Sequence, residues 1–193
     1  MSNNGRNSRY RANTTVSVLK KSKLVKMSVI NYNLRNELIA FSNSLTYCYQ
    51  CSTCSGACPV ALLTSGKYNP RKIILEANLG LENKLMDAQD SHAWDCSTCQ
   101  KCVELCPQKV GLTDIFVRIK NMCYSKGLAP EAFLLQASAV FENGVAIPYS
   151  RPIIQRREKL GLPEIKTAEI QEIKTLLKNI HFDSPLSKKV INP

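Results

Sequence analysis

Eight of the nine cysteines in this sequence fall into two runs of identical spacing. The first run is Cys48-Tyr-Gln-Cys51-Ser-Thr-Cys54-Ser-Gly-Ala-Cys58-Pro59, and the second is Cys96-Ser-Thr-Cys99-Gln-Lys-Cys102-Val-Glu-Leu-Cys106-Pro107. Both read C-x2-C-x2-C-x3-C-P, and each cysteine of the second run lies 48 positions after its counterpart in the first. This pattern is typical of chains whose thiolates hold two [4Fe–4S] clusters.

The spacing also predicts how the ligands are shared. Three cysteines at successive i, i+3 offsets can wrap one face of a compact iron–sulfur core, whereas the fourth follows a turn and precedes a proline that fixes the chain direction. We therefore expect the fourth cysteine of each run to bind the other cluster. The predicted ligand sets are Cys48, Cys51, Cys54 and Cys106 for cluster 1, and Cys96, Cys99, Cys102 and Cys58 for cluster 2.

Two other interpretations of the cysteines are less favoured. Zinc usually takes two separated C-x2-C pairs for each tetrahedral site, whereas four cysteines crowd each run here. Disulfides are typical of oxidising compartments, and the N-terminus lacks the apolar segment of a secretory signal. No stretch has the eighteen or so apolar residues of a membrane helix. We therefore expect a cytoplasmic protein without a membrane span.

The formal net charge of +11 is unevenly distributed along the 193 residues. Residues 1–36 contain eight Lys or Arg and no acid, so the rest has 18 − 15 = +3. Two oxidised clusters of about −2 each would bring that remainder to about −1. Residues 1–32 are therefore predicted to form a basic, mobile arm. The arm lacks the interleaved aromatic residues of a nucleic-acid platform, and no nucleic-acid partner is expected.

Apolar periodicity predicts an all-α fold, and no strand pattern competes over 60–145. Asn69 and Pro70 are typical of a helix start and Gly80 of a helix stop, and Thr113 is predicted to cap a later helix. The expected helices are 34–45, 70–79, 82–89, 114–126, 131–143 and 167–180. The lone Cys123 falls on the apolar face of one of them and is expected in the core.

These patterns divide the chain into three parts. The arm (1–32) precedes a helical two-cluster domain (33–145), whose region around the motifs is expected to be disordered without iron. In the extension (146–193), Pro148, Pro152 and Pro163 interrupt a less regular stretch with a basic turn over 151–159, and one amphipathic helix follows. That helix either packs on its own chain or makes contact with another subunit.

Charge, hydrogen bonds and burial tune cluster potentials, so residues beside the cysteines are candidates for this role. Lys101 or Lys109 would slightly raise the potential of cluster 2 by stabilising an added electron, although solvated surface charges are the favoured interpretation of both. Trp94 is expected to shield the cluster from water. His92 is expected to be an ordinary loop residue, since the thiolates already provide eight ligands.

The chain resembles the α-helical ferredoxins, and among them the C subunits of heterodisulfide reductase. Besides the two cysteine runs, the likeness includes Asn69-Pro70-Arg71-Lys72 and Gly161-Leu162-Pro163, and it covers roughly 45–165. The resemblance implies an electron relay from the A subunit, which bears flavin and clusters, to the B subunit, which reduces the coenzyme M–coenzyme B heterodisulfide in methanogenesis. It also implies a larger complex that contains a hydrogenase or formate dehydrogenase.

The resemblance further implies that this chain has no substrate site. The cysteine-cysteine-glycine motif of the B subunit is absent, and so is a Gly-rich nucleotide fingerprint. Two alternatives remain open at this point. One is the iron–sulfur subunit of another flavoprotein or quinone-linked dehydrogenase, and the more distant one is a zinc-dependent nucleic-acid-binding protein.

Overall fold

A computed structural model describes residues 30–87, 92–166 and 168–189, with only the backbone given for 187–189. Nearly all of the predicted arm lies outside these ranges. The α-helices are α1 (Tyr32–Phe41), α2 (Thr53–Gly56), α3 (Pro59–Leu63), α4 (Pro70–Leu79), α5 (Glu82–Leu85), α6 (Lys101–Glu104), α7 (Leu112–Ser125), α8 (Glu131–Asn143), α9 (Arg151–Lys159), α10 (Ile170–Asn179) and α11 (Ser184–Lys189). Two short 3-10 helices, η1 (Asn43–Tyr47) and η2 (His92–Asp95), precede the two cysteine runs.

The described ranges contain no strand, and the one β-type pairing there is an isolated bridge between Ile30 and Leu81. The predicted all-α class is therefore confirmed for these residues. None of the described helices is both long and apolar enough to cross a membrane.

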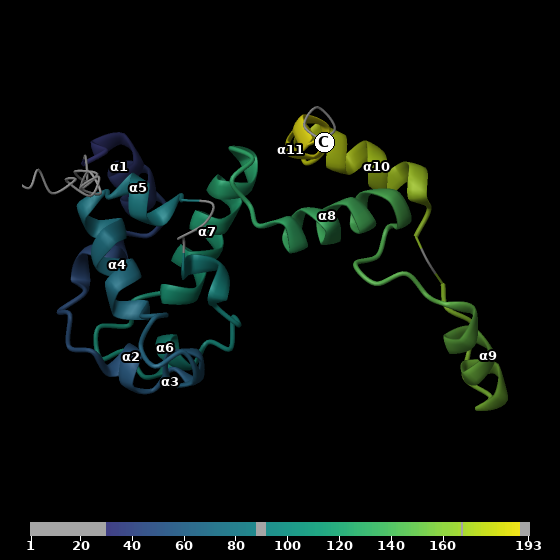
Figure 1. Cartoon of the computed structure of the whole chain (residues 1–193), viewed down its shortest axis with the longest axis horizontal. Coiled ribbons are helices and arrows are strands. Elements are labelled where there is room, and N and C mark those ends of the chain that lie inside the picture. The colour runs from purple at the N-terminus through teal and green to yellow at the C-terminus, as the bar shows by residue number, and fades with distance from the viewer. Residues whose placement is uncertain (1–29, 88–91, 167, 190–193) are drawn as a thin grey trace, which may run out of the picture.

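The core lies where α1, α4 and α7 meet (Figure 1). Leu38 of α1, Ile74 of α4 and Phe116 of α7 are fully buried there. Each comes from the apolar stripe that the sequence shows at helical spacing, and burying such stripes against one another stabilises the three helices. This three-helix body is the base from which both cysteine runs extend.

The ends of α4 are fixed by the residues that the sequence singled out. The Asn69 side chain accepts a hydrogen bond from the Lys72 N–H at 3.1 Å, and Pro70 occupies the first turn. Gly80 ends the helix in the left-handed region, with φ at 68°. A Cβ at Gly80 would lie 2.5 Å from the Asn31 carbonyl oxygen, so a side chain is excluded there. The predicted start and stop of this helix are confirmed.

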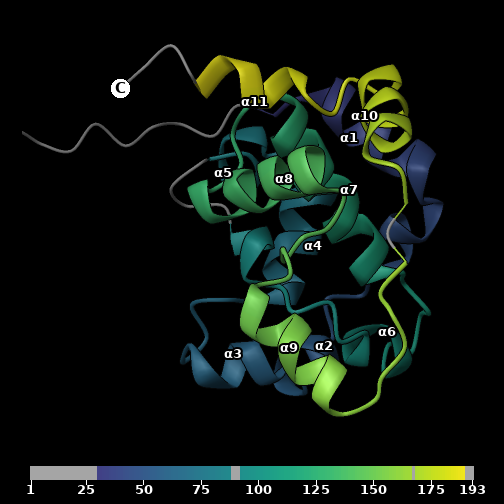
Figure 2. The same ribbon diagram turned by 90° about the vertical axis from the view of Figure 1, so that its right-hand side faces the viewer.

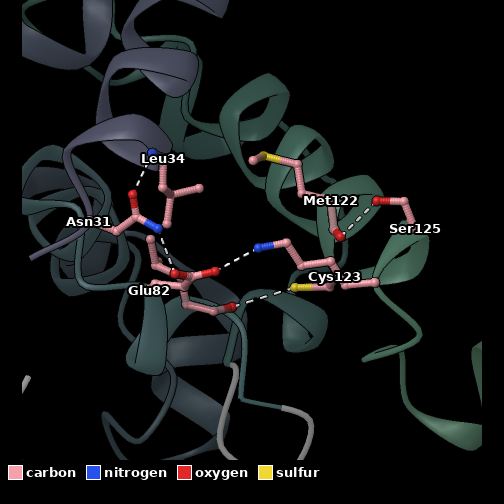
Figure 3. A network of polar contacts seen from close by, with 8 residues as sticks. Asn31, Leu34, Glu82, Met122, Cys123 and Ser125 are labelled. Atoms are coloured by element: carbon pink, nitrogen blue, oxygen red, sulfur yellow. Dashed lines mark hydrogen bonds and ion pairs between the residues drawn. The ribbon is translucent and has the colours of Figure 1, made fainter. Parts of the chain in front are cut away.

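A polar network joins the start of α1 to α5 and α7 (Figure 3). Glu82 accepts hydrogen bonds from Asn31 and Lys126, each at 2.6 Å, and these contacts lower the pKa of its carboxyl. Beside them Cys123 is fully buried and its thiol donates to the Leu85 carbonyl at 3.6 Å. Burial raises the pKa of Cys123 to about 11. The prediction of Cys123 as a core residue is confirmed.

The chain beyond the core forms a second layer of helices (Figure 1). Helix α8 leaves the body, and α10 packs along it, with Lys174 contacting Glu142 at 2.8 Å. The Tyr124 hydroxyl of α7 donates to the Phe182 carbonyl at 2.7 Å and ties this layer back to the body. The C-terminal amphipathic helix thus packs on α8 of its own chain, and its contact with another subunit stays a prediction.

Four predictions of secondary structure were wrong. The helix expected over 34–45 ends at Phe41, because Ser42 is extended and 43–47 form η1. Residues 151–159 form helix α9 and not a turn, because Pro152 in the first turn and a run of Gln, Arg, Glu and Lys favour a helix. The extension thus contains α9 and α11 as well as the expected helix. Thr113 lies inside α7, whose cap position is Gly111. Helix α5 already ends at Leu85, and the end predicted at 89 lies outside the described residues.

Candidate metal centre

The two cysteine runs have the same backbone conformation. In the first run Gln50 and Ser52 have φ of 61° and 70°, and in the second Thr98 and Gln100 have φ of 53° and 62°. Thr98 lies 48 positions after Gln50, and Gln100 lies 48 positions after Ser52, which is the offset between the cysteines of the two runs. Non-glycine residues rarely occupy this region. Alternation of left- and right-handed residues turns successive N–H groups toward one side and creates a concave site for an anionic group.

Short helices then hold the third cysteine of each run. Cys54 lies on α2 and Cys102 on α6, and these two helices are neighbours at one end of the body (Figure 1). The fourth cysteine follows each helix, and Pro59 and Pro107 come directly after the two fourth cysteines. The pairing of α2 with α6 brings the two runs together although they are far apart in the sequence.

The cysteines line two separate cavities. The first is lined by a group that we name the Cys48 set, which consists of Cys48, Cys51, Cys54 and Cys106. The second is lined by a group that we name the Cys96 set, which consists of Cys58, Cys96, Cys99 and Cys102. Each cavity therefore has three cysteines from one run and the fourth from the other.

The spacing of the side chains indicates the kind of group that fits. Within the described ranges, no three His, Cys, Asp or Glu side chains are close enough to share one metal ion. Four thiols that stand around a cavity suit a four-iron cluster, whose iron atoms each take one thiolate, better than a mononuclear zinc ion. The donor chemistry and the concave backbone thus fit [4Fe–4S] clusters. The assignment of individual ligands stays a prediction.

Side-chain and backbone donors surround the Cys48 set. Gln50 donates to the Cys48 sulfur at 3.4 Å, and Arg71 in turn donates to the Gln50 amide oxygen at 3.3 Å. The Thr53 hydroxyl lies 3.4 Å from the Cys51 sulfur and lowers the pKa of that thiol. Such contacts favour the thiolate, the form that binds metal.

The Cys96 set is bordered by a buried tyrosine and a half-buried lysine. Tyr68 is 1% exposed and lines the cavity. Burial raises the pKa of Tyr68 far above its usual range, and a hydrogen bond with Cys96 raises it further. The Lys120 ammonium donates to the Cys96 carbonyl oxygen at 3.0 Å. The Thr113 hydroxyl lies 3.9 Å from the Cys102 sulfur.

Sequence reasoning missed these last three residues. Tyr68 lies between the two runs, whereas Thr113 and Lys120 follow the second run on helix α7, so spacing alone does not connect them with the cysteines. The available signal was the position of Tyr68 directly before the Asn69 cap, which made a buried aromatic residue plausible there. Thr113 was noticed only for its capping potential.

The tuning candidates named from the sequence lie in different surroundings. Lys101 and Lys109 are both exposed, although the Lys101 backbone N–H and, to a smaller extent, its charge lower the pKa of Cys99. Trp94 is partly buried and stacks obliquely on Phe133, with ring centroids 4.6 Å apart. His92 lies 3.4 Å from Asp95 and is partly exposed. The tuning role predicted for Lys101, Lys109 and Trp94 stays a prediction.

Comparison with known proteins agrees with this geometry. A family model described as a 4Fe-4S dicluster domain matches residues 44–110, the segment that contains both runs. The chain is 34% identical over 175 residues to the C 2 iron-sulfur subunit of CoB–CoM heterodisulfide reductase from Methanocaldococcus jannaschii, covering 83% of this chain and 91% of the relative.

Two further relatives show the same likeness. The C subunit of H2:CoB-CoM heterodisulfide,ferredoxin reductase from Methanothermobacter thermautotrophicus is 32% identical over 75% of this chain and 79% of its own length. The C subunit of ferredoxin:CoB-CoM heterodisulfide reductase from Methanosarcina mazei is 32% identical over 74% of this chain and 89% of its own length. A 4Fe-4S dicluster domain on a helical body, together with identity of this extent, leads to one conclusion: the chain belongs to the family of heterodisulfide reductase C subunits.

Proposed function

We propose that this chain binds two [4Fe–4S] clusters and relays electrons within a heterodisulfide reductase complex. The observation that supports the proposal best is the pair of cavities, each lined by four cysteines. The Cys48 set would hold cluster 1 and the Cys96 set cluster 2. When bound, such clusters accept and release single electrons.

The protein's own contribution is to hold the two centres together and to control their surroundings. Because Cys58 and Cys106 each reach the cavity of the other run, both segments must be in place before either ligand set is complete. The exposed outer cysteines, Cys51 and Cys99, mark the sides on which redox partners would approach. The buried Tyr68 and Cys58 lie on the inner side.

The proposed direction of electron flow is from the A subunit, with its flavin and iron–sulfur clusters, to the B subunit, which reduces the coenzyme M–coenzyme B heterodisulfide in methanogenesis. The names of the relatives support a place in such a complex, and one of them includes hydrogen. We extend this to a cytoplasmic assembly with a hydrogenase or formate dehydrogenase. This chain would contribute no substrate site.

The extension offers a surface for contact with a neighbouring subunit. Helix α9 projects from the rest of the chain (Figures 1 and 2), and nearly every one of its side chains is exposed, Ile153 and Ile154 included. A nine-residue helix is too short to be stable in water without packing. Another polypeptide of the complex that covers α9 would supply this packing.

The relay is tested by measuring heterodisulfide reduction by the B subunit when the reduced A subunit is the only electron source. Adding the anaerobically prepared full chain should start the reaction, and the Cys99→Ala variant should not support it. Cys123→Ala is the matched control, since it replaces a buried cysteine that lines neither cavity. Equal rates with and without the chain would contradict the proposal.

A further inference from the structure

The two cysteine sets differ in the tyrosine that accompanies each. Tyr49 lines the cavity of the Cys48 set but is 69% exposed. Tyr68 lines the cavity of the Cys96 set and is 1% exposed. A hydroxyl in water already has solvent partners, whereas a buried hydroxyl must find a partner inside the protein. The same side chain therefore stands in opposite environments at the two sites.

The partner of the buried hydroxyl is a predicted cluster ligand. The Tyr68 side chain is hydrogen-bonded to Cys96, and Cys58 and Cys102 are close enough to act on it electrostatically. The backbone N–H of Tyr68 also donates to the Thr64 hydroxyl at 3.1 Å, which helps to fix the position of the tyrosine. A phenol fixed in this position donates to a thiolate and favours additional negative charge there.

A second group acts on the same set from a different element. Lys120 of α7 is half-buried and holds its ammonium 3.0 Å from the Cys96 carbonyl oxygen and 5.9 Å from the centre of the Trp94 ring. Burial lowers the pKa of Lys120, while the negative charge at Cys96 and Asp95 opposes this change. A cation in such a setting is screened less than the exposed Lys101.

We infer that Tyr68 and Lys120 are positioning residues that selectively raise the reduction potential of the cluster held by the Cys96 set. The inference rests on the proposed cluster binding. Both groups stabilise the extra negative charge that one electron brings to that site. No covalent bond forms or breaks, the electron comes from the neighbouring redox partner, and Tyr68 keeps its proton.

The inference concerns selectivity, since the Cys48 set has a donor of its own. Gln50 donates a hydrogen bond to the Cys48 sulfur, and Arg71 donates one to the Gln50 amide oxygen. Removing the Tyr68 hydroxyl or the Lys120 charge should therefore leave that site unchanged. This separates a direct electrostatic effect from a general loosening of the domain, which would affect both sites.

The test is a redox titration of the anaerobically purified full chain, followed by EPR. The spectra of Cys51→Ser and Cys99→Ser first assign one signal to each set. Tyr68→Phe and Lys120→Met should then each shift the midpoint of the Cys96-set signal to more negative potential. Tyr49→Phe and Lys101→Met are the matched controls, which remove the same groups from exposed positions. Their shifts should be smaller than those of the buried pair.

The outcomes are distinguishable. If both signals are present and Tyr68→Phe shifts neither or shifts both equally, the inference is overturned while the cluster binding stands. If the unmodified chain gives no iron–sulfur signal, the proposed function itself fails. Iron and sulfide contents measured on each variant identify misfolding, and Lys120→Met, on a different element, then provides an independent measurement of the same effect.

Discussion

The exchange of the fourth cysteine between the runs leads to a prediction about Cys58. Cys58 is 8% exposed and lines the cavity with Cys96, Cys99 and Cys102, away from the three cysteines that precede it in its own run. The Cys58→Ala substitution should therefore disrupt the Cys96 set. Iron should fall from about eight to about four atoms per chain, because one four-iron group is lost and the other is kept.

The assay compares residual spectra, which identifies the surviving centre. Chemical analysis gives the iron and sulfide contents of the anaerobically prepared variants, and EPR after reduction gives the spectrum of what remains. The Cys58→Ala spectrum should match that of Cys99→Ala, and the reciprocal Cys106→Ala spectrum should match that of Cys51→Ala. Cys123→Ala should keep both signals and the full iron content.

One result would refute this reasoning. If the Cys58→Ala spectrum matched that of Cys51→Ala, each run would hold its own cluster with all four of its cysteines. The four cysteines that line one cavity would then not be the ligands of one cluster, and the crossed arrangement would have to be abandoned.

Two further predictions concern the body that holds the sites. Leu38→Ala should lower the free energy of unfolding by about 2–5 kcal/mol, because Leu38 is fully buried where α1, α4 and α7 meet. Leu63→Ala, at an 86% exposed position, should change it by less than about 0.5 kcal/mol in the same guanidinium unfolding experiment, and equal losses would place the core elsewhere. The pKa of Cys123 is raised to about 11, above the value of about 9 expected for the unfolded chain, so the folded state binds more protons between these pH values and its stability should fall as pH rises through them. Unfolding measured at several pH values should show a smaller fall for Cys123→Ala, and an unchanged slope would contradict the assignment of Cys123 to the interior.

Much of the helical body follows from local patterns in the sequence. The Asn69 cap and the Gly80 stop delimit α4 as expected, and the apolar stripe that includes Phe116 is buried in α7. These features depend on side chains a few residues apart, which single-sequence reasoning captures well. The two cavities group the cysteines in the same way as the spacing does, while the ligand sets themselves stay a prediction.

The surroundings of the sites depend on tertiary packing and were not predictable in this way. Tyr68 and Lys120 approach Cys96 from segments 28 and 24 residues away, on opposite sides of it in the sequence, and only the packed fold brings them together. The sequence instead drew attention to Lys101 and Lys109, which are close to cysteines along the chain but lie at exposed positions. Proximity along the chain is a poor guide to charge beside a buried site.

Helix α9 shows that local sequence patterns can also lead to a wrong prediction of secondary structure. Its dense charge and its two neighbouring isoleucines give no clear stripe toward a core, and the prediction for this segment is a basic turn. Intrinsic helix propensity favours a helix over a turn in this segment, and packing against another polypeptide would stabilise it.

The central claim is that this polypeptide holds two iron–sulfur clusters on eight cysteines. The most direct measurement is the iron, sulfide and zinc content of the full chain purified without oxygen, together with its EPR spectrum after reduction. The account predicts about eight iron and eight sulfide per chain and two interacting signals. Stoichiometric zinc without iron or sulfide would contradict it.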